Sequence, residues 1–399
     1  MRVAFALTQS LDSPSGLGRY GPIAHEMVRL GYDVEIYGLH YDWANLESKR
    51  FLESGVTVAY VGQMHVRKQG PRKLYYRPAQ LMTIALSAVL RLALALRRSS
   101  ADVIHLGKPQ PINVLAARLA RLGRPIYCDC DDYEAATNRF SGRWQQIVVR
   151  YFEDSVTHYA AGLTINTHFT RARYEALGYP GHRIVYVPNG VERSRFMKQG
   201  CPEQLRERWG LSAKTPVILY VGTISTLSHS VDLLLSAFAG VHKAVPNARL
   251  VLVGGGEDYD RLQAEARALG LEQAAVFAGR VSPEEIPAYF GLATVSVDPV
   301  RDDLIARARS PLKALESLVM GVPVVTGDVG DRAAMLGHGE FGVLVKAGDS
   351  DALAQGLLAL LTDPDRREEM SRAALAAREQ WFWDHLVEDF VRVYRTPEK

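Results

Sequence analysis

Short apolar strands alternate with amphipathic helices along most of the chain, and this alternation limits the fold more than any other feature. Strands of this kind are typical of parallel sheets that helices cover on both faces. The predicted strands form two groups, namely 2–8, 33–39, 56–61, 103–106, 126–130, 162–166 and 184–187, then 217–221, 249–253, 275–278, 294–297, 322–326 and 343–345. The sequence therefore predicts an α/β protein with two doubly wound, Rossmann-like domains.

A chain of 399 residues is too long for one ordinary hydrophobic core, which agrees with two domains. The polar segment 190–216 is the best candidate for the connection between them. We expect domains at 1–195 and 196–375, and an aromatic C-terminal helix within 376–399 that crosses back to the first domain. Because ligands of doubly wound sheets bind at the carboxyl ends of the strands, we expect the two domains to face each other across a cleft.

The composition argues against several classes of protein. There are 47 Lys and Arg residues against 44 Asp and Glu, so the net charge of +3 gives no general affinity for nucleic acid. The chain enters a strand directly, without the features of a signal peptide, and has only three cysteines, so we expect a cytoplasmic protein. The most apolar helix, 81–96, has about 16 residues and contains Arg91, whereas a bilayer span needs roughly 20. We therefore expect that it does not span a membrane.

The stretch SPLKALESLVMGVPVV, which begins at Ser310, places a charged pair inside an apolar helix. Ser310 is a suitable N-cap and Pro311 suits the first helical position, so we predict that a helix begins there. Lys313 and Glu316 are three residues apart and share one face of this helix. They form either an ordinary ion pair on a solvated face or a ligand site, because the free N–H groups of a helix N-terminus suit a diphosphate.

Several separate stretches, in their order and spacing, make the sequence familiar. They are SGLGRYGPIAHEMVRLGYDVEIYG, AAGLTINTHFTRARYEALG, IVYVPNGVERSRF, LYVGTISTLSHSVDLLLSAF, RLVLVGGGEDYDRL and SPLKALESLVMGVPVVTGD. Over nearly its whole length the chain resembles the retaining glycosyltransferases of family four, also called group 1 glycosyltransferases, which have the GT-B fold. The resemblance implies a hexosyltransferase that moves a sugar from a nucleoside-diphosphate sugar to an acceptor hydroxyl.

The resemblance also implies roles for individual residues. Glu316 would bind the ribose of the donor, while Lys313 and the helix N-terminus would stabilise the leaving diphosphate. The remaining donor-binding residues would be Ser310, Leu312, Gly222, Thr223, His229, Arg280, Gly16 and Gly18. Thr223 and His229 stand where the family often has an arginine and a lysine, and Ala308 stands where it often has a glutamate. Gly16 and Gly18 lie in a glycine turn that either contacts the donor or is only a tight turn.

The motif DCDDYEA follows the fifth predicted strand and concentrates carboxylates at its end. Three aspartates so close together need a cation, water or a basic group nearby in order to ionise. Many relatives have a histidine at the position of Asp131, so we expect Asp131 to be catalytic and Asp132, with Lys108, to bind the acceptor. The alternative is a cluster that caps the following helix. No metal or cofactor is expected.

A strongly basic segment, VRKQGPRKLYYRP at residues 66–78, precedes the apolar helix. It suits an anionic membrane surface, or it is simply a solvated loop. We expect the acceptor to be a cell-envelope glycan or a lipid-linked precursor. The reaction that fits best is a front-side substitution in which the leaving diphosphate takes the proton of the acceptor. The alternatives are a catalytically inactive nucleotide-sugar-binding protein of the same fold and a GT-B sugar-nucleotide epimerase.

Overall fold

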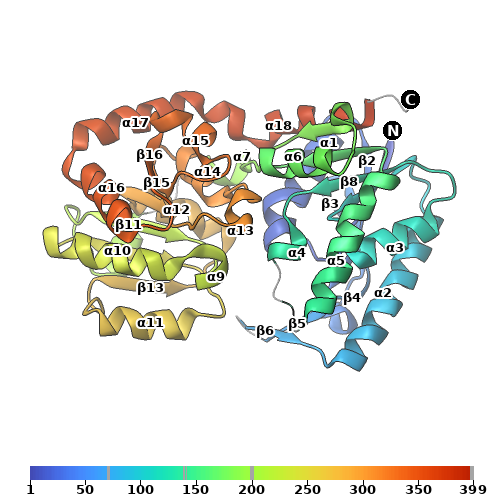
Figure 1. Cartoon of the computed structure of the whole chain (residues 1–399), viewed down its shortest axis with the longest axis horizontal. Coiled ribbons are helices and arrows are strands. Elements are labelled where there is room, and N and C mark those ends of the chain that lie inside the picture. The colour runs from blue at the N-terminus through green and yellow to red at the C-terminus, as the bar shows by residue number, and fades with distance from the viewer. Residues whose placement is uncertain (70–71, 138–139, 141, 198–201, 396–399) are drawn as a thin grey trace. The chain divides into compact units, whose positions relative to one another are not determined.

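The computed structural model describes residues 1–69, 72–137, 140, 142–197 and 202–395. These residues form two compact units (Figure 1). Unit 1 comprises Met1–Gly190 and Trp383–Lys399, and unit 2 comprises Val191–Phe382. The division at residue 190 lies close to the boundary expected at 195, and the C-terminal segment that belongs to unit 1 begins at Trp383 rather than at 376.

Unit 1 is built on an eight-stranded sheet with the order β10-β9-β8-β7-β1-β2-β4-β3. All neighbouring strands are parallel except β3, which runs antiparallel to β4. The strands of this sheet are β1 Arg2–Ala6, β2 Asp33–His40, β3 Arg50–Glu53, β4 Val56–Gln63, β7 Val103–Gly107, β8 Ile126–Cys130, β9 Gly162–Ile165 and β10 Ile184–Tyr186.

Helices cover both faces of the unit 1 sheet, and each face has its own apolar core. Helices α2, α3 and α6 pack over one core, while α1 and the C-terminal α18 pack over the other. The helical segments are η1 Gly16–Tyr20, α1 Gly21–Arg29, η2 Trp43–Asn45, α2 Pro78–Arg98, α3 Pro111–Ala120, α4 Glu134–Thr137, α5 Arg143–Ser155, η3 Val156–His158, α6 His168–Ala176, η4 Gly181–Arg183, α18 Trp383–Phe390 and η8 Val391–Arg395.

Unit 2 has a six-stranded, entirely parallel sheet with the order β13-β12-β11-β14-β15-β16. Its strands are β11 Val217–Val221, β12 Arg249–Val253, β13 Ala275–Gly279, β14 Val295–Asp298, β15 Val324–Gly327 and β16 Gly342–Val345. Its helical segments are α7 Arg193–Phe196, α8 Pro202–Arg208, α9 Thr226–His229, α10 Val231–Ala244, α11 Tyr259–Ala268, η5 Pro283–Glu285, α12 Ile286–Leu292, α13 Leu304–Arg307, α14 Leu312–Val319, α15 Arg332–Met335, η6 Gly337–Gly339, α16 Ser350–Thr362, α17 Pro364–Ala377 and η7 Arg378–Trp381.

All of the predicted strands are present, but the sequence did not predict the polar strands β3, β5 and β6. Strand β3 has a mostly exposed pattern, and the basic segment forms a hairpin of β5 Val66–Gln69 and β6 Arg72–Tyr75 instead of a loop. The helix predicted to begin at Pro311 begins one residue later, because Pro311 has an extended ψ of 92° and is itself the N-cap. Ser310 is therefore not the N-cap.

Helix α2 is longer than the sequence predicted, with 21 residues instead of about 16. By length and hydropathy alone, Ala79–Arg98 could cross a membrane, and it is the one such helix in the described part of the chain. However, its inner residues Leu92 and Leu96 are fully buried in the core over the unit 1 sheet. The helix lies on the sheet with one face, so this packing is that of a surface helix of unit 1.

Candidate active site

Helix α14 places the charged pair at the carboxyl edge of the unit 2 sheet. It lies in the crossover between the parallel strands β14 and β15, so its N-terminus follows the carboxyl end of β14. The buried stripe of α14 includes Leu315, Leu318 and Val319. Gly321 follows with φ +70°, a left-handed conformation that glycine adopts without strain, and ends the helix. The apolar stripe thus fixes the direction of the polar face.

Glu316 is completely buried, and two cations hold its carboxylate. Lys313 Nζ donates to Oε2 at 2.7 Å, and a guanidinium nitrogen of Arg195 donates to Oε1 at 3.2 Å. The Lys313 side chain is 39% exposed, whereas that of Arg195 is only 14% exposed. The sequence did not predict the contact of Arg195, which lies in helix α7. Lys313 can therefore move away from Glu316 more easily than Arg195 can.

The loop after β11 carries Gly222 and Thr223, and it packs tightly against the loop after β12. The N–H of Gly222 donates to the carbonyl of Val253 at 2.9 Å. A Cβ on Gly254 would lie 1.8 Å from the carbonyl oxygen of Gly222, and one on Gly256 would lie 2.2 Å from that of Ile224. These glycines therefore allow two backbones to touch, and the contact fixes the Gly222 and Thr223 peptides at the edge of the sheet.

His229 ends helix α9 and carries no charge at neutral pH. Burial, and then the positive charge of Arg309, lower the pKa of His229 to about 3. Its Nδ1 lies 2.8 Å from the hydroxyl of Ser228, and Arg309 donates to the carbonyl of the same serine. Arg309 precedes α14, so the permanent positive charge beside His229 comes from that loop. Arg307, by contrast, pairs with Asp302 on the surface.

The remaining positions of unit 2 that the sequence analysis singled out differ in their exposure to solvent. Ala308 is buried, and its methyl group cannot replace the carboxylate that the family often has at that position. Ser310 is buried just before Pro311, and Leu312 is half-buried in the first turn of α14. Arg280 follows β13 at the same edge of the sheet and is exposed, with its side chain against Gly255.

In unit 1, Lys108 gathers three carboxylates at the carboxyl ends of β7 and β8. Its Nζ lies 3.0 Å from Asp131, 3.0 Å from Asp132 and 2.7 Å from Glu134. Lys108 and Asp131 are both buried. Carboxylate oxygens of these three acids lie close enough together to hold a metal ion, but the ammonium group already supplies a cation there. Lys108, Asp131 and Asp132 therefore lie together at this edge of the sheet, and Glu134 is an additional member.

Burial has opposite outcomes for Asp131 and Asp129 because their partners differ. For Asp131, burial outweighs the attraction of Lys108 and, with the charge of Asp132, raises the pKa to about 7. For Asp129, burial is outweighed by Arg19, whose guanidinium binds both carboxylate oxygens at 2.6 and 2.7 Å, so its pKa falls below the ordinary value. Asp129 is thus structural and ionised, while Asp131 can change its protonation state near neutral pH.

The glycine turn of unit 1 is held closely by its neighbours. A Cβ on Gly16 would lie 2.5 Å from backbone atoms of Ser10 and Leu11. The carbonyl of Gly18 accepts a hydrogen bond from the indole of Trp383 at 3.0 Å. The next residue, Arg19, reaches Asp129 at the end of β8. The turn therefore has a definite structural role, which the sequence could not separate from donor binding.

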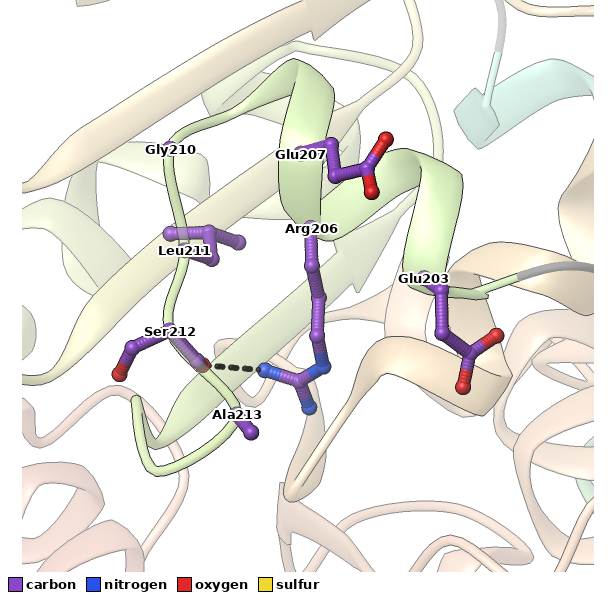
Figure 2. A pocket seen from close by; sticks show the side chains of 7 residues that line it. All are labelled: Glu203, Arg206, Glu207, Gly210, Leu211, Ser212 and Ala213. Carbon is purple, nitrogen blue, oxygen red and sulfur yellow. Dashed lines mark hydrogen bonds between the residues drawn. The ribbon is translucent and has the colours of Figure 1, made fainter.

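A surface hollow of about 480 Å³ lies elsewhere in unit 2. Figure 2 shows its lining by helix α8 and the following loop, where Arg206 donates to the carbonyl of Ser212 at 2.9 Å. This loop leads into the start of β11, so the hollow lies at the amino edge of the sheet. It is therefore separate from the carboxyl edge that carries Lys313 and Glu316.

Two family models match the chain, one on each side of its division. Residues 15–190 match the glycosyl transferase 4-like domain, and residues 202–376 match glycosyl transferases group 1. The chain belongs to the group 1 glycosyltransferases. This result confirms the family and the enzyme class that the sequence predicted.

Curated relatives include two kinds of glycosyltransferase. The D-inositol 3-phosphate glycosyltransferase of Acidothermus cellulolyticus is 34% identical over 247 residues, which cover 59% of this chain but only 53% of that protein. The GDP-mannose-dependent alpha-(1-6)-phosphatidylinositol monomannoside mannosyltransferase of Mycobacterium tuberculosis is 27% identical over 325 residues, covering 79% of this chain and 82% of the relative.

Solved structures share the fold of this glycosyltransferase. Sucrose-phosphate synthase from Thermosynechococcus elongatus gives a TM-score of 0.81 at 17% identity and covers 99% of this chain and 98% of its own. The HepE protein of Anabaena, solved with UDP and glucose, gives 0.74 at 18% identity and covers 99% of both chains. At such low identity the likeness concerns the fold alone, and it confirms the predicted GT-B class.

Proposed function

We propose that this enzyme is a retaining glycosyltransferase that moves a hexose from a nucleoside-diphosphate sugar to an acceptor hydroxyl. The observation that carries the proposal is the Lys313 and Glu316 pair in the first turns of α14, at the carboxyl edge of the unit 2 sheet. The names of the relatives support the donor class, since one uses GDP-mannose and another was solved with UDP and glucose.

On this proposal the pyrophosphate binds at the N-terminus of α14 and Lys313 turns from Glu316 to the phosphate oxygens. Glu316 then accepts hydrogen bonds from the ribose hydroxyls, while Arg195 keeps its carboxylate in place. The fixed peptides of Gly222 and Thr223 border the donor, and Arg309 provides the positive charge that His229 lacks. Binding therefore exchanges one ion pair inside the protein for one with the ligand.

The proposed reaction is a front-side substitution. A double displacement needs a carboxylate nucleophile near the anomeric carbon, and Ala308 supplies none at the position where the family often has a glutamate. In the front-side reaction the bond to the diphosphate breaks and the acceptor oxygen bonds to the same face of the sugar. The acceptor proton passes to the departing phosphate oxygen, so Lys313 acts by stabilising the charge that develops there.

Acceptor recognition is assigned to the cluster of Lys108, Asp131 and Asp132 in unit 1. Asp131 can orient a sugar or polyol hydroxyl, because its pKa of about 7 leaves both protonation states accessible. Two relatives are named for inositol phosphate and phosphatidylinositol monomannoside. A polyol or lipid-linked acceptor of the cell envelope, glycosylated on the cytoplasmic side with contact to the membrane, is the corresponding proposal for this chain.

A second candidate is a nucleotide-sugar-binding protein that has lost catalysis. Ala308, Thr223 and the uncharged His229 favour it, because each replaces a charged residue that the family often has at that position. The two candidates agree on donor binding and differ in the release of nucleoside diphosphate.

The first experiment is a thermal-shift screen of the purified chain against UDP, GDP, ADP and TDP sugars. A donor at one hundred times its dissociation constant stabilises the folded state by about 2.7 kcal/mol. One nucleotide class should raise the melting temperature of wild type. Glu316→Gln should need at least a tenfold higher concentration of that donor for the same shift. The second experiment measures nucleoside diphosphate released with and without inositol phosphate or short glycans. Release that depends on an acceptor supports the enzyme, whereas binding without any release supports the second candidate.

A further inference from the structure

The charge of unit 1 is distributed very unevenly along the chain. Residues 66–124 contain twelve Lys and Arg residues and a single acid, Asp102, although the whole chain has a net charge of only +3. Asp102 accepts a hydrogen bond from the N–H of Arg2 and is thereby engaged within the fold. Helices α2 and α3 both lie in this segment and contain no acidic residue. Lys108 is buried among three carboxylates, but no neighbouring acid in the sequence balances the other positive charges of the segment.

Helix α2 has an apolar face that the fold does not cover. Its inner side is buried against β4, α3 and the core of the sheet. On its outer side, large apolar side chains form an exposed row with one residue every four positions. The row consists of Met82 (71% exposed), Leu86 (61%), Leu90 (56%) and Leu94 (47%). Soluble proteins rarely expose such a continuous row of large apolar side chains to water. The row therefore points to a partner that is itself apolar.

Two neighbouring helices extend this exposed apolar surface. Helix α3 packs against both α2 and α5, and Figure 1 shows the three helices in the same unit. Leu115 and Leu119 of α3 are exposed, as are the side chains on one face of α5, namely Trp144, Ile147, Val148 and Tyr151. We call these residues, together with the row on α2, the apolar face.

Exposed arginines accompany the apolar face on the same helices. They are Arg91, Arg97 and Arg98 of α2, Arg118 of α3 and Arg121 just after it. An amphipathic helix that lies in a membrane interface combines apolar side chains with a basic border in this way. Each Lys or Arg close to an anionic membrane strengthens binding to it, and salt weakens this attraction.

We propose that the apolar face docks unit 1 on an anionic lipid membrane, with α2 lying parallel to the surface. The long apolar length of α2 does not span the membrane, because its inner side is packed on the sheet. A second copy of this chain is a poorer occupant, since a symmetric contact would bring the same arginines toward one another. The proposal extends the earlier assignment from the basic hairpin to the helices, and it does not depend on the chemistry of the donor site.

The test is flotation of the full chain with two kinds of vesicle, pure phosphatidylcholine and phosphatidylcholine mixed with phosphatidylglycerol. Wild type should float with the anionic vesicles only, and high salt should release it. The double variant Leu86→Glu/Leu90→Glu should lose at least tenfold in partitioning. Leu177→Glu, an exposed leucine after α6, is the matched control and should bind like wild type. The tryptophan emission of wild type should shift to the blue with anionic vesicles only, and Trp144→Phe should lose this shift.

Three outcomes would overturn the proposal. They are no binding to anionic vesicles, equal binding by the double variant and wild type, or binding that resists high salt and alkaline carbonate, which would indicate a spanning helix. Circular dichroism checks the fold of the double variant, and Trp144→Gln/Ile147→Gln on α5 repeats the test if that variant does not fold. If wild type does not bind vesicles but forms an oligomer in solution that the double variant loses, the apolar face instead binds a second copy of the chain. Donor hydrolysis in solution should be equal in all variants, so failure here leaves the proposed reaction untouched.

Discussion

Glu316 has no exposed surface, and two cationic side chains take the place of water around its carboxylate. Arg195 and Lys313 divide this task between a mostly buried and a partly exposed side chain. A ligand that offers its own negative charge can attract the exposed cation, while the buried one keeps the carboxylate oriented. The same two residues therefore have different expected roles, and kinetics can separate them.

Lys313→Ala should lower kcat by a factor on the order of 10²–10³, because one donor to the developing charge of the leaving group is lost. The KM for the donor should change much less, since the helix N-terminus still binds the phosphates. Steady-state kinetics with the donor found in the thermal-shift screen measure both constants. Lys346→Ala removes another lysine of unit 2, whose side chain is 81% exposed, and should leave both unchanged. An unchanged kcat in Lys313→Ala would remove this residue from the mechanism.

Arg195→Met should raise the KM for the donor about tenfold or more while kcat changes little. The reason is that Arg195 acts as a positioning residue through Glu316 and does not touch the reacting atoms. Arg195→Lys should restore part of the affinity, because an ammonium group can still reach the carboxylate. Equal losses of kcat in both variants, with an unchanged KM, would contradict a positioning role.

The strand ends of unit 1 form an element in which one lysine holds three acids together. Lys108 has a φ of +107°, which is unusual for a residue with a side chain, and its ammonium contacts Asp131, Asp132 and Glu134. Burial opposes the charge on Lys108, but the three carboxylates outweigh it and raise its pKa well above the ordinary value. The connection between β7, β8 and α4 therefore depends on this ion cluster.

Lys108→Met should destabilise the protein by about 3–5 kcal/mol at pH 8, because buried carboxylates are left without their cation. Burial raises the pKa of Asp131, and without Lys108 its main opposing cation is gone, so the folded state binds a proton there at a higher pH than the unfolded chain does. The deficit relative to wild type should thus shrink from pH 8 toward pH 5. Urea denaturation at several pH values measures it, and Lys346→Ala is again the control. A deficit that does not vary with pH would show that the cluster is not the cause.

The sequence predicts an element well when the residues of that element alone determine its structure, and poorly when distant partners determine it. Buried strands such as β11 and β12 are recognised from their own apolar residues, and both match the predicted bounds. Strand β3 and the β5–β6 hairpin are polar, so their pairing depends on partners that periodicity does not reveal. Likewise, Lys313 and Glu316 are neighbours in the sequence, whereas the contact of Arg195 spans 121 residues and arises only from the tertiary fold.

At the scale of the whole molecule, the chain returns to unit 1 after completing unit 2. Trp383 begins this return, with its side chain only 1% exposed and its indole N–H bonded to Gly18. The guanidinium of Arg19 also lies 5.5 Å from the centre of the Trp383 ring. The last helix is therefore part of the core of the first unit, although the sequence places it after the second.

Trp383→Ala should cost unit 1 about 3–5 kcal/mol, the usual range for removing a large buried aromatic side chain. Hydrogen exchange followed by mass spectrometry should show faster exchange in β1 and β7 and unchanged exchange in β11 and β12. Trp144→Ala, which removes a tryptophan that is 62% exposed, should leave both units unaffected. Faster exchange throughout unit 2 would contradict the assignment of the C-terminal helix to unit 1 alone.

The most direct test of the proposed reaction is a crystal structure with the nucleoside diphosphate selected by the thermal-shift screen. The account predicts the pyrophosphate at the N-terminus of α14, Lys313 turned from Glu316 to a phosphate oxygen, and the ribose hydroxyls on Glu316 with Arg195 still in place. A fully occupied nucleotide bound elsewhere, with Lys313 still on Glu316, would contradict it.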